Sequence, residues 1–114
     1  MEKTLFQKIA DKEIPAAIVY EDEHCVAFRD IAPTAPVHVL LVPRKPIPSI
    51  AAAMAEDAEL LAHLMLKVGD IARAEGIAEG GFRTVLNTGE AAGQTVPHLH
   101  IHIIGGRSLQ WPPG

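Results

Sequence analysis

Apolar and polar residues recur along this chain with two different periods, and the two periods predict its secondary structure. Residues 4–12 and 56–75 carry apolar side chains at helical spacing, which predicts one short amphipathic helix and one long helix. Five other apolar stretches have the length and composition of strands: residues 17–21, 25–29, 37–43, 82–86 and 96–104. Because short turns join consecutive strands, we expect a mostly antiparallel sheet with the long helix on one side, the α+β class.

The last predicted strand carries a histidine at every second position. His98, His100 and His102 alternate with leucine and isoleucine, so in an extended strand the imidazoles lie on one face and the apolar side chains on the other. Each imidazole can act as an acid, a base, a nucleophile or a metal ligand near neutral pH. Three of them on one face are hard to explain by packing, so this strand is the candidate functional site.

A short turn of Gly93, Gln94 and Thr95 precedes this strand, and its backbone N–H groups and the Thr95 hydroxyl are suited to hold an anion such as phosphate. Two chemistries fit the histidines. In a metal site, two of them would bind zinc together with a ligand from elsewhere, such as His38. In a nucleophilic site, the central His100 would attack an electrophile while its neighbours orient it or move protons. The turn favours the nucleophilic site.

Length and composition narrow the class of protein. The 114 residues suffice for one domain, expected over residues 1–114, and 48% hydrophobic with 21% charged residues is typical of a soluble globular chain. A net charge of −4 argues against nucleic acid as a partner, but not against a small phosphorylated ligand. Every apolar run is too short to span a membrane. The single cysteine and an N-terminus unlike a signal peptide predict a cytoplasmic protein.

The segment 93–104 resembles the defining motif of the histidine-triad nucleotide-binding family, which is His-x-His-x-His followed by apolar residues. The glycine pair with arginine at 105–107 and the ending Trp-Pro-Pro-Gly at 111–114 are similar to its Hint-type branch of nucleoside phosphoramidases. The similarity covers essentially the whole chain. It implies a five-stranded antiparallel sheet with one long helix, and a homodimer in which two such sheets continue as one.

The resemblance also implies an activity that needs no cofactor or metal. Members of the family cleave phosphorus–nitrogen bonds in substrates like adenosine 5′-monophosphoramidate, so the implied partner is a purine nucleotide (AMP or GMP) or a nucleoside phosphoramidate. By the same match, His100 attacks the α-phosphorus and forms a nucleotidyl-histidine intermediate. His38 and His98 form a hydrogen-bonded relay behind it, and His102 sits against the phosphate. The Thr95 hydroxyl serves the phosphate or the leaving amine.

The nucleoside end of the implied site maps onto further residues. Asp30 matches the carboxylate that takes the ribose hydroxyls, and Asn87 matches an asparagine that braces the phosphate site. The apolar walls of the base pocket are matched by Leu5, Phe6, Ile9, Phe28 and Ile31. The turn beside the phosphate is matched by Gly93, Gln94, Thr95 and Val96. Each has a plainer alternative, since Asp30 and Asn87 also suit turns and the apolar residues also suit a core. In the family the tail crosses toward the partner's active site, so the resemblance implies that Trp111 shapes leaving-group choice.

Two departures from the family pattern keep other functions open. Pro46 stands where many Hint-type members carry another histidine, which shortens any proton relay beyond His38. Thr95 in place of serine is also seen in the dinucleoside-polyphosphate hydrolase branch. The alternatives are therefore such a hydrolase, a zinc-binding protein, or a nucleotide-binding interaction module. His24 and His63 match no catalytic position and are expected to be structural. The identity of the leaving amine and the choice between adenine and guanine stay open.

Overall fold

The computed structural model describes residues 2–114. Within that range two α-helices, α1 (Leu5–Ala10) and α2 (Ala58–Ala74), pack against five strands. The strands are β1 (Ile18–Glu21), β2 (Cys25–Arg29), β3 (Val37–Pro43), β4 (Phe82–Val85) and β5 (Ile101–Gly105). Three short 3-10 helices lie in the connections: η1 (Ile50–Ala52), η2 (Ala55–Asp57) and η3 (Glu90–Ala92). No helix in this range combines the length and the apolar composition needed to cross a membrane.

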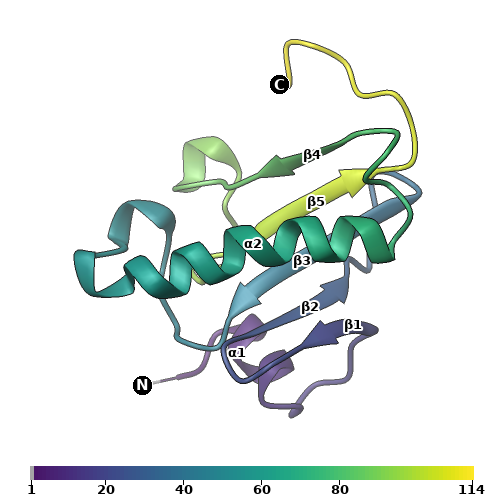
Figure 1. Cartoon of the computed structure of the whole chain (residues 1–114). Coiled ribbons are helices and arrows are strands. Elements are labelled where there is room, and N and C mark those ends of the chain that lie inside the picture. Colours follow the sequence, from purple (N-terminus) through teal and green to yellow (C-terminus); the bar gives the residue numbers. More distant parts are fainter. Residues whose placement is uncertain (1) are drawn as a thin grey trace.

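The described strands form one sheet in the order β1-β2-β3-β5-β4, and every pair of neighbours is antiparallel. The long α2 lies across one face of the sheet, while the short α1 lies behind β2 near the opposite face (Figure 1). The prediction of an α+β fold with a five-stranded antiparallel sheet is confirmed.

Each face of the sheet has its own apolar layer. Below α2 the layer joins strand residues to the apolar stripe of the helix: Val39, Leu41, Ile101, Ile103, Leu64 and Val68. On the other face, residues of α1 pack on the alternate positions of β2 and β3: Phe6, Ile9, Val26, Phe28, Leu40 and Val42. β3 is therefore buried on both faces, as its apolar sequence predicts. His38 lies on the α1 side of this strand, because it alternates with Val39 and shares its face with Leu40.

α1 has only six residues, too few to be stable alone, so its ends and its packing hold it. Thr4 is the N-cap, and its side-chain oxygen accepts a hydrogen bond from the Gln7 N–H at 3.1 Å. The helix ends at Ala10 rather than at the predicted residue 12, because Lys12 takes a positive φ of 61° that a helix cannot hold. α2 is followed by Gly76 at φ 76°, a left-handed conformation that ends a helix and that glycine adopts without strain.

β5 begins five residues later than predicted, at Ile101 rather than at 96. Pro97 has no N–H to give to a sheet, the His98 N–H turns back to the Val96 carbonyl at 2.8 Å, and the Leu99 N–H donates to the Ile47 carbonyl at 2.7 Å. The segment before β5 therefore leaves the ladder with β3. Of the three alternating histidines, only His102 is part of the strand.

Candidate active site

The register of β3 and β5 brings two histidines together on the α1 face of the sheet. His38 pairs with Ile104 and Leu40 pairs with His102, so the two histidines are diagonal neighbours on one face. The His38 Nε2 and the His102 Nδ1 lie 2.9 Å apart. This contact follows from strand pairing alone, and it gives His38 a partner other than the one expected.

The predicted relay between His38 and His98 is wrong. The His98 Nδ1 lies 2.8 Å from the Thr4 hydroxyl, and its Nε2 lies 2.8 Å from the Pro43 carbonyl oxygen. The reason is the register of the two strands: Leu41 pairs with Ile101 at the end of the β3–β5 ladder, so His98 lies further on, beside the end of β3. His38 stands near the opposite end of the same strand.

The proton positions in the His38–His102 pair follow from a backbone donor. The Thr34 N–H donates to the His38 Nδ1 at 3.1 Å, so in the neutral ring the His38 proton is on Nε2. That proton is donated to the His102 Nδ1, which in turn places the proton of neutral His102 on its Nε2. Asp30 lies beside the pair, with one oxygen 3.5 Å from the His38 Nε2. Its other oxygen accepts the Ala32 N–H at 2.8 Å, so Asp30 is also a turn residue.

A second chain of hydrogen bonds fixes His98 and His100. The Pro43 carbonyl can only accept, so the His98 proton is on Nε2 and its Nδ1 accepts from the Thr4 hydroxyl. The His98 main-chain carbonyl then accepts the Nδ1–H of His100 at 2.8 Å. In neutral His100 this leaves Nε2 as the nitrogen with the lone pair, which is the form that a nucleophilic imidazole requires.

The rings are held by one another and by Phe6. The ring centroids of Phe6 and His100 lie 4.8 Å apart in an edge-to-face arrangement, and those of His100 and His102 lie 5.0 Å apart. His98 is fully buried and His100 is buried, whereas His102 is half-buried. Burial lowers the pKa of His98, and burial with the nearby charges of His100 and His38 lowers the pKa of His102 to about 4. Both rings are therefore neutral at pH 7.

The turn at residues 93–95, which was expected to bind phosphate, uses two of its backbone N–H groups in hydrogen bonds within the protein. The Gly93 N–H donates to the Glu90 carbonyl at 3.0 Å and the Gln94 N–H donates to the Gly89 carbonyl at 3.1 Å. The prediction that these two N–H groups face an anion is therefore wrong, because η3 continues into the turn and uses them. The exposed Thr95 follows directly. A pocket of about 420 Å³ opens here, and its lining is uncharged: Pro48, Ser49, Thr88, Gly89, Gln94, Thr95 and Pro97.

The five residues matched to a base pocket divide into two groups. Phe6, Ile9 and Phe28 are buried, with the two phenyl centroids 5.5 Å apart, so the plainer core interpretation holds for them. Leu5 and Ile31 are exposed, at 47% and 100% of their surface. Only the exposed pair has apolar surface to offer a ligand in this conformation.

The remaining predicted residues lie further along the chain. Asn87 is half-buried two residues after the end of β4, and Val96 is half-buried against the α1 layer. Trp111 is 81% exposed in a C-terminal tail that runs away from the sheet (Figure 1). The tail is fastened where Arg83 of β4 donates to the Gln110 carbonyl at 2.8 Å. Within one copy of the chain, Trp111 is therefore a surface residue.

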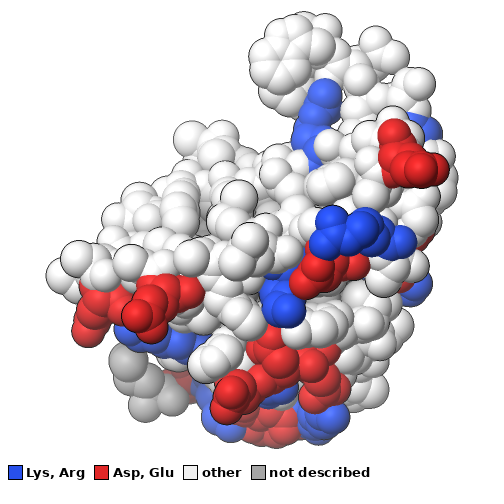
Figure 2. All heavy atoms as spheres, viewed as in Figure 1, with Lys and Arg blue, Asp and Glu red and all other residues white. Residues whose placement is uncertain are grey.

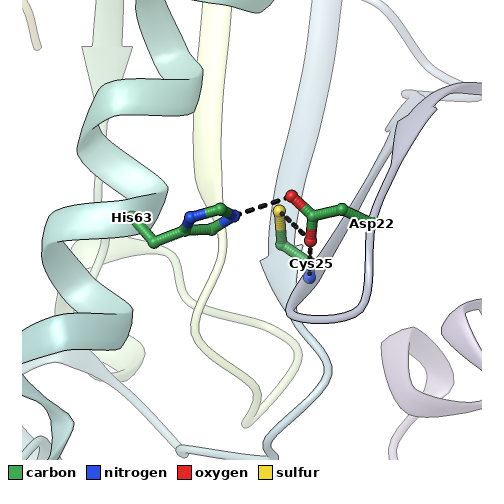
Figure 3. Close-up of side chains that lie close together, drawn as sticks. All are labelled: Asp22, Cys25 and His63. Atoms are coloured by element: carbon green, nitrogen blue, oxygen red, sulfur yellow. Dashed lines mark hydrogen bonds and ion pairs between the residues drawn. The ribbon is translucent and has the colours of Figure 1, made fainter.

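A second polar cluster lies on the α2 face, where His63 of the helix meets Asp22 and Cys25 (Figure 3). One Asp22 oxygen accepts from the Tyr20 hydroxyl and the His63 Nε2, each at 2.7 Å. The other accepts the backbone N–H groups of His24 at 2.7 Å and Cys25 at 2.9 Å. Both carboxylate oxygens are thus filled by donors, so the cluster is a structural fastening between α2 and the β1–β2 turn.

The charge of Asp22 is favoured by these donors. Burial alone would raise the pKa of Asp22, but the hydrogen bonds from Tyr20, His24 and His63 outweigh it and hold the pKa well below its usual range. Burial also raises the pKa of the Cys25 thiol to about 12, with the Asp22 charge adding to the effect. A thiol with that pKa is inert at neutral pH. Cys25 is a core residue.

The sequence alone did not reveal the residues that hydrogen-bond to the candidate catalytic histidines and hold their rings in place. Thr4 caps α1, and its hydroxyl also contacts His98, 94 positions later in the chain. Thr34 and Pro43 act through backbone atoms that carry no side-chain signature. A motif reports side-chain identity, so contacts of this kind leave no signal in it.

Comparison with known proteins agrees with this architecture. The family model for the HIT domain matches residues 11–109. A HIT-like protein of Synechococcus elongatus is 61% identical, over 99% of this chain and 98% of its own length. A 14 kDa zinc-binding protein of Zea mays is 44% identical, over 97% of this chain and 88% of its own length.

Solved structures extend the comparison to the fold. A HIT family hydrolase from Legionella pneumophila matches with a TM-score of 0.96 at 47% identity, covering 98% of this chain and 100% of that one. A histidine triad protein from Clostridium difficile matches with a TM-score of 0.92 at 39% identity, covering 96% and 97% of the two chains. The chain therefore belongs to the HIT domain family.

Proposed function

We propose that this protein is a nucleoside phosphoramidase, which hydrolyses the P–N bond of substrates like adenosine 5′-monophosphoramidate to a nucleoside monophosphate and an amine. The observation that carries the proposal is the state of His100, a buried imidazole whose Nδ1 proton is held by the His98 carbonyl at 2.8 Å. Its Nε2 is therefore the nitrogen available for attack. Relatives of solved structure from Legionella pneumophila and Clostridium thermocellum are named HIT family hydrolases, which supports hydrolysis in general.

In the first step the His100 Nε2 attacks the α-phosphorus and the P–N bond breaks. The amine leaves with a proton, and the nucleotidyl group is bonded to His100. As the ring becomes cationic, its Nδ1–H bond to the His98 carbonyl becomes charge-assisted and strengthens, which stabilises the intermediate. The His102 Nε2–H, fixed by the chain from Thr34 through His38, donates to a phosphate oxygen as negative charge develops there.

In the second step water attacks the phosphorus and neutral imidazole is the leaving group. One water is consumed overall, its oxygen goes to the nucleoside monophosphate, and its proton balances the one carried off by the amine. Thr95 is suited to donate to the departing nitrogen, because it is exposed at the edge of the uncharged 420 Å³ pocket. An uncharged lining suits a neutral substituent on the amine.

The nucleoside would lie along the α1 side of the sheet. Asp30 has a carboxylate oxygen near His38 and supplies an acceptor for the ribose hydroxyls. The exposed Leu5 and Ile31 supply apolar contacts for the base. Apolar contacts do not read the edge of a base, so both AMP and GMP are accommodated.

A homodimer accompanies this proposal. β4 is the outermost described strand on its side of the sheet, where a second copy can add its own β4 and continue the sheet. α2 exposes Met65 and Leu66 at 55% and 73% of their surface. Charged side chains crowd the lower half of the face in Figure 2, whereas the part over β4 and the adjoining side of α2 carries few. Light scattering of the purified protein is expected to give about twice the chain mass of 12.2 kDa.

A zinc site is the second candidate. The maize relative is named a zinc-binding protein, and ligand atoms of Asp30, His38 and His102 lie within 4.8 Å of one another. Both nitrogens of His38 are already engaged, one by Thr34 and one by His102, so a metal would have to displace one of these contacts. We therefore expect chelation to leave phosphoramidate turnover unchanged and added zinc to inhibit it. Loss of turnover on chelation would favour the metal.

The experiment that tests the proposal measures turnover of adenosine 5′-monophosphoramidate by the wild type and by His100→Asn. We expect kcat to fall by roughly 10⁴-fold or more, because the nucleophile is lost. His24→Asn is the matched control, since His24 is exposed on the β1–β2 turn, away from the triad. Turnover retained in His100→Asn would contradict the proposal. A faster reaction with diadenosine polyphosphate than with phosphoramidate would favour the dinucleoside-polyphosphate hydrolase branch instead.

A further inference from the structure

We propose that Thr4 is a positioning residue for the nucleophile, acting on His100 through His98. The proposal rests on the proposed function, in which His100 attacks phosphorus. Thr4 stands just before α1, as its N-cap. Its hydroxyl lies 2.8 Å from the His98 Nδ1, at the start of a chain of contacts that ends on the His100 ring.

The Thr4 hydroxyl performs two tasks with one oxygen. As N-cap it accepts the Gln7 N–H at 3.1 Å. Its own proton is donated to His98, because the Pro43 carbonyl fixes the His98 proton on Nε2 and leaves Nδ1 as an acceptor. The hydroxyl is therefore the donor that completes the hydrogen bonding of a fully buried imidazole.

The position of His98 decides where its carbonyl points. The His98 ring is held by Thr4 on one nitrogen and by Pro43 on the other, and the following peptide is held by the Leu99 N–H bond to Ile47 at 2.7 Å. The carbonyl between these anchors accepts the Nδ1–H of His100. A change at the Thr4 end therefore moves or frees the group that sets the His100 tautomer.

The helix that Thr4 caps also touches His100 directly. Phe6 of α1 packs edge-on against the His100 ring at 4.8 Å, and the neighbouring Leu5 is exposed on the side proposed for the base. Thr4 itself makes no proposed contact with substrate. Loss of its donated proton, with the helix cap retained, is expected to lower kcat while KM stays nearly constant, since Leu5 and the other ground-state contacts to the nucleoside are then unchanged.

Three substitutions separate capping from positioning. Thr4→Ser keeps the hydroxyl and both of its bonds. Thr4→Asp keeps a strong cap, because aspartate is among the best N-cap residues, but a carboxylate has no proton to donate to His98. Thr4→Val has nearly the shape of threonine and loses both bonds. We expect kcat to fall roughly tenfold in the Asp and Val variants and by less than about twofold in the Ser variant, the scale of one buried hydrogen bond.

A second readout does not depend on turnover. Nitrogen NMR of the histidine rings is expected to show His98 as the Nε2–H tautomer in the wild type and in Thr4→Ser. In Thr4→Asp the carboxylate accepts from Nδ1, so we expect the His98 Nδ1 to become protonated and the His100 signals to shift. Thermal unfolding of each variant reports the contribution of the cap separately.

The proposal fails if Thr4→Asp keeps wild-type kcat and the wild-type His98 tautomer, because Thr4 is then a helix cap only. It fails equally if Thr4→Val loses stability without any change in kcat or in the histidine spectra. Failure of the proposed function looks different: the wild type itself would not turn over phosphoramidate, while the NMR of the variants would still report whether Thr4 sets the His98 and His100 tautomers.

Discussion

Two imidazole-containing clusters lie on opposite faces of the same sheet, and they differ in where their hydrogen bonds end. Around Asp22, donors from a hydroxyl, an imidazole and two backbone N–H groups converge on one carboxylate. In the triad cluster the bonds run in sequence, from Thr34 through His38 to His102 and from Thr4 through His98 to His100. In the Asp22 cluster every one of these hydrogen bonds ends on the carboxylate. In the triad cluster each chain of bonds ends on a histidine ring, that of His102 or His100.

The comparison shows that residue types alone do not distinguish a reactive site from a structural one. Both clusters contain histidine and aspartate, and both are partly buried. What differs is the direction of the bonds: the carboxylate of Asp22 has no capacity left, while the neutral rings of His100 and His102 end with a lone pair and an N–H respectively. The predictions below test this contrast, from the largest expected effect to the smallest.

Replacing the terminal imidazole of each cluster should give opposite outcomes. His102→Asn removes the N–H expected to face the phosphate, so kcat should fall by roughly 10² to 10³-fold. His63→Asn removes only a donor to Asp22, so kcat should stay within about twofold while the melting temperature drops. Steady-state kinetics and thermal unfolding of both variants check the prediction. A large loss of kcat in His63→Asn would contradict the claim that the Asp22 cluster is structural.

Lowering the pH should reduce the free energy of unfolding, because His102 binds a proton less readily in the folded chain than in the unfolded one. The folded pKa of His102 is about 4, below its ordinary value of 6.5, so between these values the unfolded chain binds more protons than the folded one. Its contribution to stability is therefore present above pH 6.5 and is lost as the pH falls toward 4, by up to about 3 kcal/mol. Denaturant unfolding at several pH values should show a shallower pH dependence in His102→Asn. Parallel curves for the two proteins would contradict it.

Removing the charge of Asp22, at the centre of its cluster, should lower the stability of the protein without changing kcat. Asp22→Asn keeps the size of the side chain but replaces one accepting oxygen by a donor that faces other donors, so the free energy of unfolding should fall by about 2 kcal/mol. Asp70→Asn is the control, because Asp70 is exposed and its pairs with Lys67 and Arg73 are worth less than about 1 kcal/mol. Changed kcat in Asp22→Asn would link the two clusters.

The smallest expected effect is at Thr95. Thr95→Ser keeps the hydroxyl and should leave kcat within about twofold, whereas Thr95→Ala should lower it about tenfold with phosphoramidates whose amine leaves poorly. Substrates with a good leaving group should be nearly unaffected, because their departing nitrogen needs little proton donation. A loss independent of the leaving group would place Thr95 on the phosphate instead.

The elements of the fold were predictable because their signals are local. The period of apolar residues in α2 and the continuous apolar run of β3 report which faces are buried, and Gly76 reports where a helix stops. The alternation of three histidines indicated the site. These patterns need only neighbouring residues, so the sequence contains them in full.

The partners of each histidine were not predictable, because they depend on register and on contacts between distant segments. A β5 that began at residue 96 would have kept His98 in the ladder. Pro97 and the Leu99 bond to Ile47 end the ladder at Ile101, and the register that pairs Leu40 with His102 brings His102, not His98, to His38. The internal bonds of Gly93 and Gln94 depend in the same way on η3, which has no clear apolar period to predict it.

The most direct test of the central claim is to find where the nucleotide is attached during turnover. The wild type is mixed with adenosine 5′-monophosphoramidate, quenched within the first turnover, digested and analysed by mass spectrometry. The account predicts an adenylyl group on His100, absent in His100→Asn. An adduct on His98 or His102, or complete single turnover without any adduct, would contradict it.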